Sequence, residues 1–158
     1  MEKRHLEDFF ETIVTRPEYK QFGLTLPIML IYRNIFNEAE TYFKTTYDLI
    51  HSDVDVLTAL YFYGKVLSPT DLYAATVFSS GGMTKILKKL ETYGYITRKA
   101  CPNDKRSTLV FLEKKGEKLV EKCLVDVIEK RKELFQVLTE DEKDNLQKIL
   151  EKLTYTLF

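Results

Sequence analysis

The chain has little of what several protein classes depend on. It has 158 residues but no tryptophan and only two cysteines, Cys101 and Cys123. Two isolated cysteines supply neither a disulfide framework nor the ligand spacing of a zinc site. No apolar run approaches the ~20 residues that span a bilayer, and residues 1–5 lead into acidic and aromatic positions instead of a signal-peptide core. We therefore expect a cytoplasmic protein with reduced thiols and no membrane partner.

Signs of catalysis are missing as well. The histidines His5 and His51 have no nucleophile motif near them, and the sequence contains no glycine-rich phosphate loop and no carboxylate pair in a recognisable setting. We predict a protein that is not an enzyme and has no cofactor and no metal site. A redox role for Cys101 or Cys123 stays open, because Cys101 is expected near cations that favour a thiolate.

Net charge is also absent, since 24 basic side chains balance 24 acidic ones. Neutrality at first argues against a nucleic-acid partner, which normally needs a cationic surface. The distribution reverses this argument. Residues 61–112 hold 8 basic and 3 acidic side chains, whereas residues 1–60 hold 6 and 10 and residues 113–158 hold 10 and 11. The middle third of the chain therefore carries a net positive charge, whereas both flanks are net negative.

This middle segment reads as two short helices. The first is predicted to open at Ser68, because a hydroxyl N-cap, Pro69 at the first helical position and Asp71 at the third agree on one start. The second carries an apolar stripe at the helical period, formed by Met83, Ile86, Leu87 and Leu90, with lysines at other positions. Gly94 is expected to end it.

A hairpin should follow these helices. Residues 95–98 and 107–112 have the β-branched and aromatic content of two strands, and the loop from Cys101 to Arg106 contains turn-forming residues and two cations. Two closely spaced helices suit a DNA major groove, while a basic hairpin reaches the backbone or the minor groove. The segment therefore predicts a winged helix-turn-helix.

The same residues resemble the MarR (multiple antibiotic resistance regulator) family of transcription factors. The similarity covers roughly residues 53–122 and rests on residues 67–72, 80–84 and 94–98 and on the wing 102–106, with Gly116 following. One departure is Glu113, where the family usually has a threonine that caps the next helix. The resemblance implies a dimer that binds DNA, often with a small phenolic or otherwise aromatic effector.

We expect one folded domain that is mainly α with a small β-hairpin wing. Residues 1–52 would form N-terminal dimerisation helices, residues 53–112 a winged helix-turn-helix lobe that binds DNA, and residues 113–158 C-terminal dimerisation helices. Helices are predicted over residues 6–14, 24–47 with Pro27 in the first turn, 52–64, 114–135 and from a capping box at Thr139 onward. The alternative is that the terminal helices pack only within one chain.

Twelve residues are predicted to bind DNA. Arg106 matches the wing arginine that the family inserts into the minor groove, Asp104 would orient it, and the family adds Thr70 as a phosphate contact. Arg98 is either a phosphate ligand or part of a salt bridge, and the lysines are otherwise an ordinary solvated face. The full set is Thr70, Ser79, Ser80, Gly81, Gly82, Thr84, Lys85, Lys88, Arg98, Asp104, Lys105 and Arg106.

The chain is rich in aromatic residues, with ten tyrosines and ten phenylalanines. By the resemblance, Tyr32, Phe36, Tyr61 and Phe62 are candidates for lining an effector pocket, and the alternative is that they are ordinary core residues. The predicted function is a dimeric, sequence-specific transcription regulator, a ligand-responsive repressor that reads a pseudo-palindromic operator in double-stranded DNA. The alternative is a winged-helix protein-interaction or dimerisation module that does not bind DNA.

Overall fold

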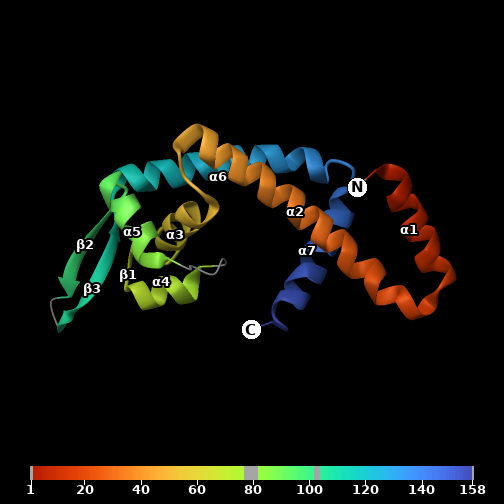
Figure 1. The fold of residues 1–158 in the computed structure, drawn as a ribbon, viewed down its shortest axis with the longest axis horizontal. Helices are drawn as coiled ribbons and strands as arrows, with labels where there is room; N and C mark the ends of the chain where they lie inside the picture. The colour runs from red at the N-terminus through yellow and green to blue at the C-terminus, as the bar shows by residue number, and fades with distance from the viewer. Residues whose placement is uncertain (1, 77–81, 102–103, 158) are drawn as a thin grey trace. The chain divides into compact units, whose positions relative to one another are not determined.

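The computed structural model describes residues 2–76, 82–101 and 104–157, and of residues 104–107 it describes the backbone only. The chain divides into two compact units, Met1–His51 and Ser52–Phe158, which are described separately. Both are largely helical, and the second contains one small antiparallel sheet (Figure 1). The predicted fold class, mainly α with a β wing, is confirmed.

The first unit contains α1 (Lys3–Thr15), a short 3-10 turn (Pro17–Tyr19) and α2 (Lys20–Tyr47). The ring of Phe9 on α1 lies 6.3 Å from that of Phe22 on α2, measured between centroids. A Cβ atom added to Gly23 would lie 2.8 Å from Cγ2 of Ile13, so α1 approaches α2 closely where α2 has no side chain. The helix predicted over residues 6–14 is confirmed and is longer at both ends.

The predicted start of α2 was wrong. The helix begins at Lys20 instead of Leu24, so Pro27 lies inside it and not in its first turn. Proline lacks an N–H, and the carbonyl of Gly23 therefore has no donor four residues later. The helix continues because its other turns pair normally, and it ends where Asp48 adopts a left-handed backbone with φ 54°.

The second unit holds the remaining elements. They are α3 (His51–Phe62, which begins at the boundary), β1 (Val66–Leu67), α4 (Pro69–Ala75), α5 (Met83–Thr92), β2 (Ile96–Cys101), β3 (Asp104–Leu112), α6 (Lys114–Phe135) and α7 (Glu140–Thr154). The predicted helix over residues 114–135 is confirmed, and so is the capping box: the Thr139 hydroxyl accepts from the Glu142 amide while the Glu142 carboxylate accepts from the Thr139 amide.

The sheet has the order β1-β3-β2 and differs from the predicted hairpin in two ways. The strand β1 was not predicted, and it pairs Val66 with Phe111 and Leu67 with Val110. The long strands also extend into the expected loop, because Cys101 lies in β2 and Asp104 begins β3. Pairing with a neighbouring strand overrides the turn-forming tendency of individual residues there. The basic residues Lys105 and Arg106 therefore lie on a strand backbone and not in a loop.

From α3 to β3 the second unit has a dense apolar core. Seven apolar side chains there are fully buried, namely Val56, Leu57, Leu60, Leu72, Leu90, Ile96 and Val110. We call residues 53–112 the winged lobe. The helix α6 packs closely on this lobe, since a Cβ atom added to Gly116 would lie only 2.4 Å from the carbonyl oxygen of Tyr95. The ammonium of Lys115 also donates to the carbonyl of Tyr93.

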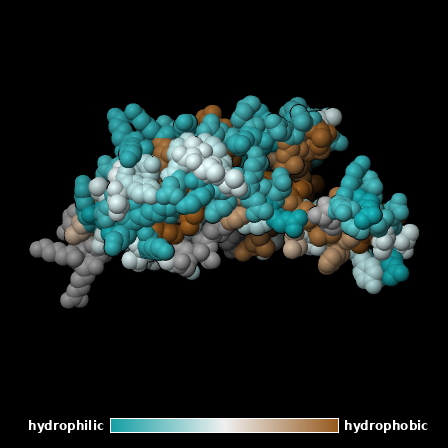
Figure 2. All heavy atoms as spheres, turned by 45° about the horizontal axis from the view of Figure 1, so that its top comes forward, coloured by the Kyte–Doolittle hydropathy of each residue, from teal (hydrophilic) through white to brown (hydrophobic). Residues whose placement is uncertain are grey.

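The last helix differs from the lobe because none of its residues is buried. Leu153 is 51% exposed and Ile149 56%, although both belong to the apolar stripe that predicted the helix. The surface in Figure 2 shows apolar side chains (brown) among hydrophilic ones (teal). Large exposed apolar residues also occur on α1, α2 and α6, among them Val14, Ile28, Met29, Val125 and Ile128.

Candidate nucleic-acid interface

The helix α4 begins as its sequence predicts. The Ser68 hydroxyl accepts a hydrogen bond from the Asp71 amide at 3.1 Å and donates to the Asp71 carboxylate at 2.6 Å. This cap fixes the start of a helix of only seven residues, for which propensity alone is insufficient. Thr70 is therefore held in the first turn of α4, where it is exposed.

The helix α5 separates its apolar and polar faces cleanly. Ile86, Leu87 and Leu90 are buried in the winged lobe. Three predicted DNA-binding residues, Thr84, Lys85 and Lys88, are exposed. Among the described residues the two lysine ammonium groups form no ion pair, so both charges are available to an anionic partner. Gly82 precedes the helix with φ 120°, a conformation that favours glycine.

The structure brings three of the predicted residues to one groove. Thr70 of α4, Thr84 of α5 and Arg98 of β2 border a groove of about 410 Å³. Its lining consists of Pro69, Thr70, Tyr73, Met83, Thr84, Leu87, Arg98 and Thr108. The groove thus joins both helices to the wing, which is the geometry that a helix-turn-helix needs to present its second helix together with its wing.

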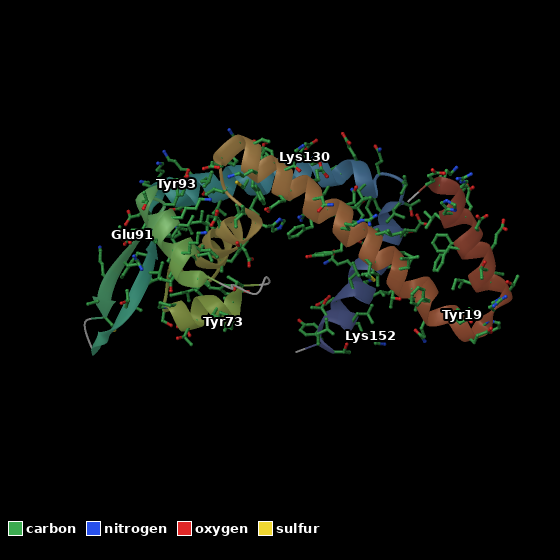
Figure 3. The ribbon with its side chains drawn as sticks, in the orientation of Figure 1. Tyr19, Tyr73, Glu91, Tyr93, Lys130 and Lys152 are labelled. Atoms are coloured by element: carbon green, nitrogen blue, oxygen red, sulfur yellow. The ribbon has the colours of Figure 1, made fainter. Side chains whose placement is uncertain are left out.

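Tyr73 is a groove residue that the sequence analysis missed. Its side chain is 61% exposed, and Figure 3 labels it on α4. The signal was present in the sequence, because one residue along a helix turns a side chain by about 100° and Tyr73 directly follows the core residue Leu72. An exposed phenol next to Thr70 adds a hydrogen-bonding group to this surface.

Arg98 forms a salt bridge, which was one of its two predicted roles. Its Nε donates to Oε2 of Glu91 at 3.0 Å, and its backbone N–H donates to Oε1 of the same carboxylate at 3.2 Å. The hydrogen bond from Arg98 holds the pKa of Glu91 below its usual value, and the same bond raises the pKa of Arg98. The end of α5 is therefore tied to the wing strand β2.

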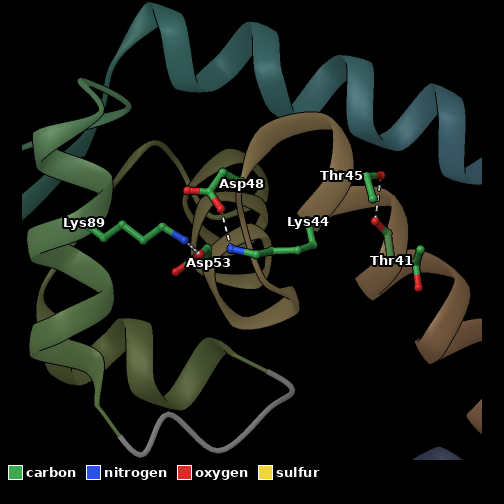
Figure 4. A network of polar contacts seen from close by, with 6 residues as sticks. All are labelled: Thr41, Lys44, Thr45, Asp48, Asp53 and Lys89. Atoms are coloured by element: carbon green, nitrogen blue, oxygen red, sulfur yellow. Dashed lines mark hydrogen bonds and ion pairs between the residues drawn. The ribbon is translucent and has the colours of Figure 1, made fainter.

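Lys89 points inward, unlike the lysine before it. Its Nζ lies 2.6 Å from Oδ2 of Asp53 on α3, and only 1% of the Asp53 side chain is exposed (Figure 4). The sequence showed Asp53 as part of a helix start and Lys89 as one of three similar lysines. Their pairing joins residues 36 positions apart, which no local pattern reveals.

Comparisons with known proteins show which family this arrangement is similar to. A model of the MarR family matches residues 47–107. An uncharacterised HTH-type transcriptional regulator of Bacillus cereus is 27% identical over 126 residues, which cover 79% of this chain and 83% of that protein. The chain is therefore similar to the MarR family in sequence.

Solved structures of MarR-like regulators share this similarity. A putative MarR-like transcription regulator from Bacillus cereus superimposes with a TM-score of 0.74 and 26% identity, covering 88% of this chain and 99% of that one. A mutant of MarR from E. coli, crystallised in complex with operator DNA, gives a TM-score of 0.69 and 25% identity, covering 85% of this chain and 96% of that one.

Six of the twelve predicted DNA-binding residues lie wholly or partly outside the described structure. Ser79, Ser80 and Gly81 lie outside the described residues. The backbones of Asp104, Lys105 and Arg106 form the first part of β3, and Asp104 pairs with Cys101 of β2 at the tip of the wing. Their role in DNA binding stays a prediction.

The four candidate effector residues fall into two pairs, one in each unit. Tyr32 and Phe36 lie on α2 with ring centroids 5.7 Å apart, and Phe36 stacks on His51 at 4.5 Å. Tyr61 and Phe62 lie at the end of α3 with centroids 5.3 Å apart. Phe62 is 62% exposed and Tyr32 is 52% exposed, so neither is an ordinary core residue. Their role in effector binding stays a prediction.

The remaining chemistry in the described part of the chain is sparse. Burial raises the pKa of the Cys123 thiol to about 11, so it stays protonated at neutral pH and is a poor nucleophile. Cys101 is only partly buried. Across residues 2–76, 82–101 and 104–157, no three His, Cys, Asp or Glu side chains converge in a way suited to a metal ion. None of the helices within these ranges has the length and apolar character to cross a membrane.

Proposed function

We propose that this chain is a dimeric, sequence-specific, DNA-binding transcription regulator, and that it acts as a ligand-responsive repressor. The observation that carries the proposal is the exposed surface shared by α4, α5 and β2, where Thr70, Thr84 and Arg98 border one groove. Lys85 and Lys88 stand exposed on the same recognition helix, α5. The E. coli relative that was crystallised with operator DNA supports this use of the surface.

The division of labour follows from the chemistry of each part. Hydroxyl and ammonium groups near the start of α5 suit base edges and phosphates in the major groove. The wing would carry Arg106 to the minor groove, where the negative potential is strongest in narrow stretches. Thr70 would contact a phosphate from the start of α4. Each contact is weak alone, and together they would fix the register of the lobe on the duplex.

The dimer is proposed from the terminal helices. Apolar side chains that are about half exposed, such as Ile128 of α6 and Leu153 of α7, are costly to leave in water when they gather on a helix face. A two-fold axis would cover such faces and would set two α5 helices about 34 to 36 Å apart, one turn of DNA. The operator would then be pseudo-palindromic.

The proposal that a ligand regulates DNA binding rests on two aromatic pairs, Tyr32 with Phe36 and Tyr61 with Phe62. A small aromatic acid bound to such groups would change operator affinity by preferring one spacing of the two lobes. We also propose that the chain acts in the cytoplasm and has no enzymatic role. The competing function, a winged-helix interaction module, has no need for exposed lysines on α5, and the family relatives give it no support.

A selection experiment tests the proposal. The full-length protein is incubated with a random library of duplexes of about 30 base pairs, long enough for two half-sites one turn apart. We expect enrichment of a pseudo-palindromic sequence, bound more tightly than a scrambled duplex of equal composition and with an affinity that falls steeply as salt rises. Failure to enrich any sequence would contradict DNA recognition. A titration with aromatic acids then tests the effector, which we expect to change both operator affinity and melting temperature.

A further inference from the structure

The two lysines in the second half of α5, Lys88 and Lys89, are adjacent in sequence and opposite in environment. Lys88 is exposed, whereas Lys89 forms an ion pair with the buried carboxylate of Asp53 on α3 (Figure 4). We propose that Lys89 and Asp53 are positioning residues, which set the orientation of α5 for DNA reading without touching DNA themselves. This inference rests on the proposed function and assigns a role to two residues outside the predicted contact set.

Asp53 is a buried charged residue. Its side chain is 1% exposed and lies in the first turn of α3, whose neighbouring residues Val54, Val56 and Leu57 are apolar and buried. A carboxylate removed from water needs a partner with well-aligned hydrogen bonds. The ammonium of Lys89 at 2.6 Å supplies such a partner, and the helix start at α3 favours a negative charge. The pair is therefore held in one geometry.

The other contacts of α5 do not provide the same constraint. The buried stripe of Ile86, Leu87 and Leu90 is held by the hydrophobic effect, which has no preferred direction and tolerates small rotations about the helix axis. The directional contacts lie at the end of the helix. Lys89 ties that end to α3, and Glu91 ties it to Arg98 of β2. The two ion pairs together fix one end of α5 between the core helix and the wing.

The ion pairs of Lys89 and Glu91 lie toward the end of α5, so they set the orientation of the start of the helix. The candidate DNA contacts Thr84 and Lys85 lie near the start of α5, four to five residues before Lys89, so a rise of 1.5 Å per residue separates them by about 6 to 7.5 Å. A rotation of the helix at the fixed end would move both contacts relative to the base edges. Base recognition depends on such alignment, whereas attraction to phosphates does not.

The test compares neighbouring lysines on one helix. Lys89→Met and the control Lys88→Met are each titrated with the duplex selected by the wild-type protein and with its scrambled counterpart, over a series of salt concentrations. For Lys89→Met we expect the ratio of the two affinities to fall by about tenfold, the scale of one lost base contact, with the salt dependence unchanged. For Lys88→Met we expect weaker binding to both duplexes and a salt slope lower by about 1 for each lysine removed.

Two further variants keep the test independent of folding. Lys89→Met removes the ammonium group from beside a buried carboxylate and risks unfolding. The double variant Asp53→Asn with Lys89→Met is therefore titrated as well, after its melting curve shows that it is folded at the assay temperature. We expect it to show the same loss of operator preference, while Lys89→Arg retains the preference of the wild type.

The outcomes separate this inference from the function on which it rests. If the wild-type protein selects no sequence, the proposed function fails. If the wild type discriminates between duplexes and the folded double variant does so equally well, the pair is only a structural contact and the inference is overturned. A reduced salt slope for Lys89→Met would identify Lys89 as a phosphate ligand and would overturn it too.

Discussion

The winged lobe and the last helix, α7, have equally regular apolar patterns, but only the lobe buries its apolar residues. In the lobe, Leu60, Leu72 and Val110 are fully buried by their own chain. In α7 the stripe that includes Leu150 and Leu153 repeats at the same period, yet no residue of the helix is buried. Periodicity predicts a helix in both places, but it does not say what covers the helix. The lobe completes its core within one chain, and α7 presents a face suited to a second copy.

The largest effect should come from the centre of the lobe. Leu60→Ala removes a fully buried side chain from α3 and is expected to lower the free energy of unfolding by about 2 to 5 kcal/mol. Chemical denaturation with a far-ultraviolet circular dichroism signal measures this loss, and Leu157→Ala, at a position 76% exposed, is the control with little expected change. An equal loss of unfolding free energy in both variants would contradict the proposed difference in burial between the winged lobe and the C-terminal segment.

A charged substitution tests whether the apolar face of α7 lies in the proposed dimer interface. Leu153→Asp should leave the lobe folded but weaken the proposed dimer by tenfold or more, about 1.4 kcal/mol, because an unpaired carboxylate would be buried in the interface. Sedimentation over a series of protein concentrations measures the dissociation constant. Lys152→Asp, a charge change one position away, is the control. An unchanged dissociation constant for Leu153→Asp would remove this face from the interface.

The next test concerns the contribution of the wing to operator affinity. Arg106→Ala is expected to weaken operator binding by about 1 to 3 kcal/mol, the usual scale of one arginine contact, with no effect on the dimer. A fluorescence titration at fixed salt measures it, with Arg131→Ala on α6 as the control cation outside the winged lobe. Unchanged affinity would mean that the wing arginine is an exposed cation without a role.

The smallest effect should appear at the start of α7. The backbone amide of Thr139, followed by its hydroxyl, holds the pKa of Glu142 below its usual value by donating a hydrogen bond to the Glu142 carboxylate. A carboxyl group with a lowered pKa in the folded state stabilises the fold above its unfolded pKa, and this contribution is lost as the pH falls through the folded value. Glu142→Ala should therefore lower the melting temperature at pH 7, and the difference from the wild type should narrow in acid. A difference that stays constant with pH would contradict this role of the cap.

Much of the fold was predictable because local chemistry decides it. The start of α4 at Pro69 follows from the Ser68 cap, and the end of α5 follows from the apolar stripe and the positive φ of Gly94. The start of α2 was missed because Pro27 was placed in the first turn, where proline is favoured. In the structure the helix already includes Gly23, whose missing side chain lets Ile13 approach. That contact comes from a different helix and is invisible to a local pattern.

The candidate site was predictable to a lesser degree. Family motifs and charge segregation pointed to Thr70, Thr84 and Arg98, and the structure places these three around one groove. The predicted loop of the wing was too long, because strand pairing extends to Cys101 and Asp104. The pairing of Lys89 with Asp53 was not foreseen, since an inward lysine has the same local sequence as an outward one. Only the packing of α5 on α3 distinguishes them.

The spacing of the two half-sites tests dimeric operator recognition, because such recognition requires the lobe to read DNA and the terminal helices to pair the lobes. The wild-type protein is titrated with its selected pseudo-palindromic duplex and with a variant carrying about 5 additional base pairs at the centre, half a turn of DNA. We expect two chains to bind the original duplex and high affinity to be lost on the variant, since its half-sites face opposite sides of the DNA. Equal affinity for both duplexes would contradict dimeric operator recognition.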